Sequence, residues 1–215
     1  MSRTAHHSPF NPSDSTARLL VRVGIALAVI VSVLAFAVRA QAQQVNRSTI
    51  SVRPAVGALI AVGSQHDAMK NAVIVGGQAA WVFDPNVAVV GAFGWSRSQE
   101  KQMVQQPDLD LYQYDLGLEV QLNNLTQGSA VITRPYVAVG AGARTYDLRK
   151  VDGTHVQTDP LLYSALGVEL DHNGGFGLRL EARDNITAFK GFRGEFGDRT
   201  ARHDLQFSAG LTFGI

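Results

Sequence analysis

The sequence predicts an all-β fold, an eight-stranded antiparallel up-and-down transmembrane β-barrel that follows an N-terminal signal peptide. The first observation is that residues 203–215 alternate between apolar and polar side chains, the pattern of a strand with two unlike faces. The second is that several other segments place charged residues opposite apolar ones in the same rhythm. The third is that the links between strand candidates are alternately long and short, as expected of a barrel that crosses a membrane.

Residues 1–42 are expected to form a cleaved signal peptide. Arg18 and Arg22 precede an apolar run over residues 23–38, and Ala40-Gln41-Ala42 supplies the small-x-small pattern of a cleavage site. An uncleaved signal anchor is the alternative, because the run of 16 residues is just under the length that spans a membrane.

Cleavage of the leader on export would change the balance of charged residues. The chain has 19 Lys and Arg against 18 Asp and Glu, but the leader contains four arginines and one aspartate, which leaves 15 against 17. This balance does not favour nucleic acid as a partner, and the absence of Cys excludes disulfides and thiol-bound metals. Residues 43–48 are expected to be a short periplasmic lead and residues 49–215 an outer-membrane barrel, because membrane residence must come from strands.

Turn-forming residues separate the eight strand candidates. The short links at 84–86, 123–128 and 171–175 are rich in the Asn, Asp, Gly and Pro residues of hairpins, whereas the other links are longer. With both chain ends in the periplasm, the long links, at 63–71, 97–108, 149–160 and 186–202, lie outside the cell. The predicted strands are residues 49–62, 72–83, 87–96, 109–122, 131–148, 161–170, 176–185 and 203–215.

The two faces separate most clearly in the fourth and seventh predicted strands, where Asp115, Glu119, Arg179 and Glu181 alternate with leucines. An arginine on the lipid face at mid-bilayer costs about 2–4 kcal/mol. We therefore expect the charges to face the lumen and the apolar side chains to face lipid. A soluble lipocalin-like barrel would have the opposite arrangement. The test set of lipid-facing residues is Leu116, Leu118, Leu178, Leu180, Leu205 and Leu211.

An eight-stranded barrel leaves a lumen that side chains can fill, so the inward charges are expected to form an ion-paired plug. The turn at 171–175 places Glu169 roughly across from Arg179, which predicts one specific pair. A network that gates a narrow polar path is the alternative to one that only keeps the barrel closed. The predicted network is Arg53, Asp115, Glu119, Arg144, Glu169, Arg179, Glu181 and Arg183, with Asp204 as a further inward carboxylate.

Aromatic residues lie near both ends of the predicted strands, as in the girdles of membrane barrels. Trp81, Phe83, Phe176 and Phe213 are expected at the periplasmic rim, and Trp95, Tyr112 and Tyr114 at the outer rim. In the outer loop 186–202, aromatic residues alternate with cations, which suggests contact with lipopolysaccharide phosphates or another external ligand. An ordinary loop that packs its own aromatic residues over the barrel mouth is the favoured interpretation.

Catalysis and metal binding are not expected, and neither is a cofactor. The best constellation is His203 with Asp204 and Ser208, but His203 and Ser208 lie on opposite faces of one strand, about 16 Å apart along it. The remaining histidines after the leader are scattered over predicted loops and turns: His66, His155 and His172.

Two motifs resemble the OmpA/OmpX/OmpW-like outer-membrane β-barrel domain family. One is the strand Arg134-Pro135-Tyr136-Val137-Ala138-Val139-Gly140-Ala141-Gly142, and the other is Ser208-x-Gly210-x-x-Phe213-x-Ile215. The second resembles the signal read by the barrel-assembly machinery, with Ile215 where the family prefers an aromatic residue. The resemblance implies a monomeric eight-stranded barrel in the cell outer membrane, assembled by that machinery with periplasmic chaperones. It does not imply a tethering role, because no peptidoglycan-binding domain follows the last strand.

These observations favour a structural or interaction protein of the outer membrane, with a plugged lumen, exposed loops, and membrane lipid and lipopolysaccharide as partners. A narrow channel or carrier for small amphipathic solutes is the first alternative. A lipid A-modifying enzyme is the second, and the histidine geometry argues against it.

Overall fold

The structure is a computed structural model that describes residues 50–63, 66–67, 69–101, 107–122, 125, 131–150, 153–172, 176–188 and 201–215. The predicted signal peptide at 1–42 and lead at 43–48 lie outside the described residues, as does most of the predicted loop 186–202. Within the described part, no helix is long and apolar enough to cross a membrane.

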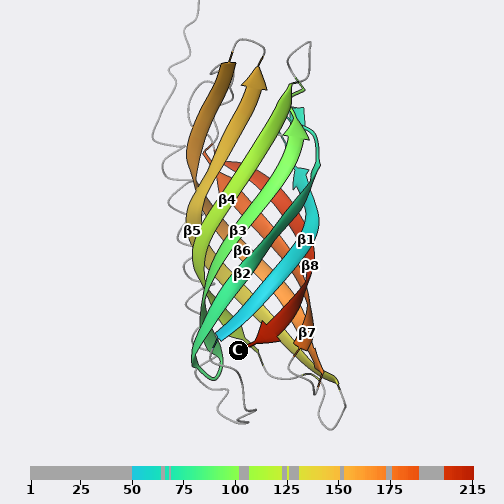
Figure 1. Ribbon diagram of the computed structural model, residues 1–215. Helices are drawn as coiled ribbons and strands as arrows, with labels where there is room; N and C mark the ends of the chain where they lie inside the picture. The colour runs from blue at the N-terminus through green and yellow to red at the C-terminus, as the bar shows by residue number, and fades with distance from the viewer. Residues whose placement is uncertain are drawn as a thin grey trace, which may run out of the picture. The chain divides into compact units, whose positions relative to one another are not determined.

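Eight antiparallel strands form a closed barrel in which each strand pairs with its neighbour in sequence and β8 pairs back with β1 (Figure 1). This confirms the predicted fold class. The closure leaves no open sheet edge along the membrane-spanning part of the wall, because the first and last strands pair with each other. The strands are β1 (Ile50–Ala61), β2 (Ala72–Asp84), β3 (Val87–Gln99), β4 (Asp108–Gln121), β5 (Val131–Lys150), β6 (Gly153–His172), β7 (Phe176–Thr187) and β8 (Arg202–Gly214).

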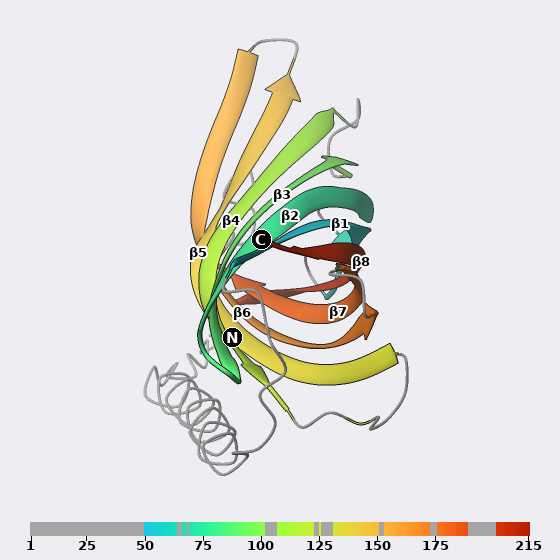
Figure 2. The ribbon, with the colours of Figure 1, turned by 60° about the horizontal axis from the view of Figure 1, so that its bottom comes forward.

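The predicted outer loop at 149–160 is wrong. β5 and β6 pair continuously from Val131↔His172 to Lys150↔Gly153, and this hairpin rises past the neighbouring strands (Figures 1 and 2). β7 ends at Thr187, opposite Leu161, so the outer end of β6 extends beyond it. A strand above the bilayer has no lipid-facing apolar side, so this segment lacks the alternation that identified the other strands.

The predicted faces are confirmed. The six test leucines are 39–62% exposed on the outer surface, whereas Arg179 and Glu181 are 5% and 6% exposed. The burial pattern alternates along β7 from Phe176 to Thr187, as expected when one side faces lipid and the other faces a filled lumen.

Three apolar clusters lie inside the barrel, and the sequence analysis missed all of them. One consists of Ala138, Leu161, Tyr163 and Ala165. The two others lie toward opposite ends of the lumen. The smaller joins Ala80, Ala88 and Val90 near the periplasmic turn between β2 and β3. The larger fills the outer part of the lumen, where Met69 from the β1–β2 connection packs among strand residues. Alternation identified which residues share a face but not where the inward face changes from polar to apolar. The larger cluster is Leu59, Ala61, Met69, Leu109, Leu111, Tyr146 and Leu148.

Candidate functional site: the ion-paired lumen

The charged side chains of the lumen form a connected network, and Arg179 of β7 lies at its centre. Its Nη2 donates to Glu119 Oε2 at 2.7 Å and to Glu181 Oε2 at 2.9 Å. Its Nη1 donates to Glu169 Oε2 at 3.3 Å. All four residues are buried. One guanidinium therefore connects carboxylates from β4, β6 and β7.

Arg53 extends the network to β1. Its Nη1 and Nη2 donate to the two carboxylate oxygens of Glu119 at 2.9 and 3.3 Å, which makes a bidentate pair. Nη2 of Arg53 also lies 3.7 Å from Glu169 Oε2. Since β1 and β4 are not neighbours in the sheet, this pair crosses the lumen instead of following the strand ladder.

Arg183 continues the network on the other side of Arg179. Its Nη1 donates to Asp115 Oδ2 at 2.9 Å, and its Nε donates to Glu181 Oε1 at 3.2 Å. The ion pairs thus run without interruption from Arg53 to Asp115, the carboxylate at the end of this series of pairs. Charges held this way are compensated by both ion pairing and hydrogen bonding, the condition for burying them.

A second group of charged side chains lies on the inner faces of β5 and β8. Arg144 forms an ion pair with Asp204, and its Nη2 donates to Gln113 Oε1 at 2.7 Å. Nε2 of Gln113 donates to Asp115 Oδ2 at 3.1 Å, so this amide joins the second group to the central network. Arg202 is also buried inside the barrel. It shares the inward face with Asp204, but the sequence analysis assigned it to an outer loop.

Two tyrosine rings pack against guanidiniums of the network. The guanidinium of Arg179 lies 3.6 Å from the ring centroid of Tyr136, and that of Arg183 lies 4.0 Å from the ring centroid of Tyr163. Each ring lies over at least one glycine of another strand: a Cβ at Gly167 would meet the Tyr136 hydroxyl at 2.2 Å. The lumen is thus layered as glycine, tyrosine, arginine and carboxylate, with cation–π contact between the middle layers. The glycines under Tyr163 are Gly117 and Gly140.

The structure places all eight predicted network residues inside the barrel, each at most 8% exposed. Seven make direct ion pairs with one another, and the register of β6 and β7 pairs Glu169 with Arg179. Arg144 is linked to them through Gln113. The role of the set as a plug stays a prediction. The eight are Arg53, Asp115, Glu119, Arg144, Glu169, Arg179, Glu181 and Arg183.

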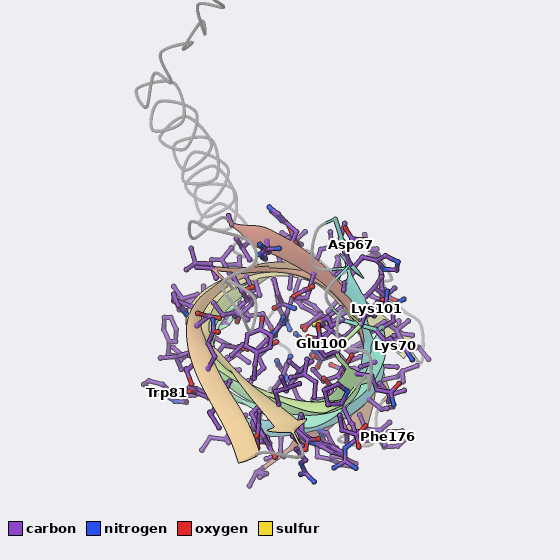
Figure 3. All side chains as sticks on the ribbon, turned by 90° about the horizontal axis from the view of Figure 1, so that it is seen from above. Asp67, Lys70, Trp81, Glu100, Lys101 and Phe176 are labelled. Atoms are coloured by element: carbon purple, nitrogen blue, oxygen red, sulfur yellow. The ribbon has the colours of Figure 1, made fainter. Side chains whose placement is uncertain are left out.

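The predicted aromatic girdles lie on the outer surface but differ in extent. At the periplasmic rim, Trp81, Phe83, Phe176 and Phe213 are all exposed, and Trp81 and Phe176 point away from the lumen in Figure 3. At the outer rim, Trp95 and Tyr114 are exposed and Tyr112 is half-buried, and these three residues come only from β3 and β4. The three predicted outer residues therefore cover one side of the barrel.

His203 does not pair with Asp204, contrary to the constellation singled out in the sequence. It faces outward and its Nδ1 lies 3.0 Å from Asp184 Oδ2, while Asp204 is buried with Arg144. Ser164 is the cross-strand neighbour of Asp184 on β6, so the carboxylate lies between the serine and the histidine. A catalytic triad needs the histidine in that middle place. Within the described residues, no group of three or more His, Asp or Glu is arranged to hold a metal ion.

A family profile described as "Outer membrane protein beta-barrel domain" matches residues 28–213. The chain belongs to this family. It is therefore a protein of the cell outer membrane, and the resemblance found in its sequence motifs is confirmed. None of the curated proteins compared with the chain matches it significantly.

Solved structures show the same fold at low sequence identity. Neisserial surface protein A matches with a TM-score of 0.59 and 15% identity, over 78% of this chain and 98% of that protein. OprG from Pseudomonas aeruginosa matches with a TM-score of 0.50 and 14% identity, over 80% of this chain and 98% of that one. Both are similar in fold to this barrel, and the identities are too low to carry further properties across.

Proposed function

We propose that this protein is a structural and interaction barrel of the outer membrane, whose lumen is closed by ion pairs and whose outer surface contacts partners. The observation that carries the proposal is the unbroken network from Arg53 to Asp115, which crosses the lumen between β1, β4 and β7. An ion or solute on this path would have to separate buried, hydrogen-bonded charges, which is costly in a low-dielectric interior.

The apolar clusters support closure on either side of the charged layer. Met69 and its neighbours fill the outer part of the lumen, and Val90 with its neighbours lies toward the periplasmic turn between β2 and β3. Hydrated ions avoid such constrictions, because apolar walls offer no replacement for the lost water. The lumen therefore combines a paired charged middle with an apolar layer that favours exclusion of water.

Liposome swelling with small sugars and amino acids tests the closed lumen. We expect liposomes with the wild-type protein to swell no faster than empty ones. A double Arg53→Ala, Arg179→Ala variant should swell measurably if it folds, because it removes the guanidiniums that hold Glu119. Arg97→Ala is the matched control, since Arg97 binds Asp110 at the outer rim instead of in the lumen. Rapid swelling with wild-type protein would instead support a narrow channel or carrier.

The projecting β5–β6 hairpin supports the interaction role. Residues from Gly153 to Pro160 pair with β5 but lie beyond the end of β7, so the described β7 offers this edge no partner. An edge of this kind can add a strand from an extended peptide. Replacing residues 149–154 by an Asn-Gly turn shortens the hairpin but keeps Tyr146 and Leu148 of the lumen cluster, and it should weaken binding of the barrel in nanodiscs to an array of extracellular proteins. Unchanged binding would remove the hairpin from the proposal.

Lipid and lipopolysaccharide are the proposed surroundings of the outer wall, and the protein is proposed to be a monomer folded with periplasmic chaperones. The seam where β8 pairs with β1 gives Gly210 a physical role in assembly: a Cβ there would meet Pro54 O on β1 at 2.5 Å. Phe213 pairs with Val52 across the same seam, and Ile215 N donates to Ile50 O at 2.9 Å. Gly210, Phe213 and Ile215 thus lie where β8 closes on β1, which suits the proposed assembly signal.

A lipid A-modifying enzyme is the remaining alternative. His203 and Asp184 form an exposed pair on the outward-facing surface of β7 and β8. Mass spectrometry of lipid A from cells that express the protein separates this alternative from the proposal. An unchanged lipid A mass is expected, and a loss or gain of one acyl chain that depends on His203 would favour the enzyme.

A further inference from the structure

The outward face of the barrel carries a mostly apolar groove of about 860 Å³ that crosses β1 to β5. It runs from Phe213 and Val52 to Tyr114 and Ala141. Val52 is the third residue of β1 and Ala141 the eleventh of β5, so the groove rises from the periplasmic end of the wall toward the outer rim. Phe213 and Ala141 are five strand spacings apart, about 24 Å. Since the acyl chains of one leaflet extend about 15 Å, the groove is long enough for one chain.

The strand register gathers small residues on the floor of the groove. Ala79 on β2 pairs with Gly91 on β3, and Gly77 on β2 pairs with Pro54 on β1. A Cβ at Gly91 would come within 4 Å of only one atom, Leu116 Cδ1 at 3.9 Å, so the space above this glycine is open. The groove is therefore a depression in the surface that faces lipid. The larger, exposed side chains that border its floor are Val52, Phe93, Leu116 and Phe213.

A row of hydroxyl groups continues the groove at its outer end. The Tyr114 hydroxyl lies 3.3 Å from Thr145 Oγ1, which lies 2.9 Å from Thr158 Oγ1. The three residues come from the adjacent strands β4, β5 and β6. Hydroxyl groups are costly to place in hydrocarbon, so we expect this row at the level of the lipid head groups. Because each hydroxyl can donate one hydrogen bond and accept two, the row retains capacity for a ligand.

Aromatic and charged side chains flank the hydroxyl row. Trp95 on β3 is 37% exposed and pairs across the strands with Tyr112 on β4. The guanidinium of Arg97 lies 5.6 Å from the ring centroid of Trp95. Arg97 and Arg149 both form ion pairs with Asp110, so their charges are already compensated and do not favour a bare anion. Flat aromatic faces beside hydroxyl groups instead suit sugar rings, which have both apolar faces and hydroxyl groups.

We propose that this outward-facing surface binds a glycolipid of the outer leaflet, with one acyl chain in the groove and the sugar head group on Tyr114, Thr145 and Thr158. A phospholipid can fill the groove with its chain but presents fewer hydroxyl groups to the row. The inference deepens the proposed function and rests on the lipid contacts proposed there. It names the class of lipid and the part of the wall that binds it.

Native mass spectrometry of the full-length protein tests the groove. The protein is released from nanodiscs that contain equal amounts of lipid A and phosphatidylglycerol, and we expect the wild type to retain lipid A in preference. Ala79→Leu fills the groove and should retain about fivefold less lipid A. Ala58→Leu is the matched control, since it adds the same volume on the exposed face of β1 outside the groove and should retain lipid A like the wild type.

Thr145→Val tests the head-group contacts separately, because it removes the middle hydroxyl of the row with little change in shape. The preference for lipid A over phosphatidylglycerol should fall about fivefold, while the total amount of retained lipid stays the same. Thr133→Val is the matched control. Thr133 lies on the same face of β5 near the periplasmic end of the strand, and its loss should leave the preference unchanged.

Equal retention of the two lipids by the wild-type protein would overturn the proposal, and this measurement does not depend on any variant folding. Equal lipid A retention by Ala79→Leu and Ala58→Leu would also overturn it, as would a preference that survives in Thr145→Val. Heat-modifiable gel mobility checks that each variant is folded. None of these measurements involves the lumen, so a failure here is distinct from rapid liposome swelling, which would reject the closed lumen instead.

Discussion

The two sides of the lumen wall are built differently. On β4, β5, β6 and β7, large side chains fill the interior in layers, with Tyr136 and Tyr163 over glycines and Arg179 and Arg183 over the tyrosines. On β1, β2, β3 and β8, the wall carries small residues and encloses a cavity of about 40 Å³. The comparison teaches that all of the eight predicted network residues except Arg53 are anchored on one side of the barrel, while the other side leaves a small unfilled space.

Loss of Arg179 should have the largest effect on the filled side. Arg179→Ala leaves Glu119, Glu169 and Glu181 without their shared guanidinium, and breaking such a buried pair costs about 3–5 kcal/mol. Urea unfolding in detergent micelles measures the change in the free energy of unfolding. Arg97→Ala, which removes a half-exposed pair at the rim, should cost no more than about 1 kcal/mol. Equal losses for the two variants would contradict the network.

A methyl group under Tyr163 should have the next largest effect. In Gly140→Ala the new Cβ would lie 2.4 Å from Cε1 of Tyr163 and 2.5 Å from Leu116 O, so ring and backbone must shift. Overpacking of this kind typically costs about 1–3 kcal/mol. Gly91→Ala is the matched control, because its Cβ would meet only Leu116 Cδ1, at 3.9 Å. If the two variants unfold at the same urea concentration, the tyrosine–glycine layer does not stabilise the barrel.

Removal of the Tyr136 hydroxyl should have a smaller effect. Tyr136→Phe keeps the ring under Arg179 but loses the hydrogen bond that the hydroxyl donates to Glu181 at 3.0 Å. A loss of about 0.5–1.5 kcal/mol in the free energy of unfolding is expected. Tyr136→Leu also removes the cation–π contact and should cost more. An equal cost for both variants would mean that the guanidinium gains nothing from the ring.

Substitution on the sparsely filled side should have the smallest effect. Ala92→Ser adds one hydroxyl next to the cavity, where Asp115 and Gln78 can accept its hydrogen. Stability should therefore stay within about 0.5 kcal/mol of wild type in the same urea titration. A loss as large as that of Gly140→Ala would show that this side is as tightly packed as the other.

Much of the barrel was predictable from alternation alone. Lipid on one side and paired charges on the other give each membrane-spanning strand two unlike faces, which is why Leu178 and Arg179 could be assigned to opposite sides. Short turns also allow registers to be counted, and the structure does pair Glu169 with Arg179. Both inferences depend only on residues close together in sequence.

The remaining features depend on contacts between residues far apart in sequence. Tyr136 and Gly167, or His203 and Asp184, become neighbours only through the register between strands, which a single sequence does not reveal. Met69 enters the lumen from a connection, where no periodicity marks an inward face. The outer end of the β5–β6 hairpin was missed for a different reason, because residues 149–160 are mostly polar and do not alternate between apolar and polar side chains.

Conductance of single molecules in planar lipid bilayers tests most directly whether the ion pairs close the lumen. The wild-type barrel is expected to insert, as shown by heat-modifiable protein recovered from the membrane, without resolved current steps. The Arg53→Ala, Arg179→Ala variant should show steps if it inserts as well. Steady, voltage-independent openings of the wild-type protein, unchanged in that variant, would contradict an interior sealed by the pairs that Glu119 makes with Arg53 and Arg179.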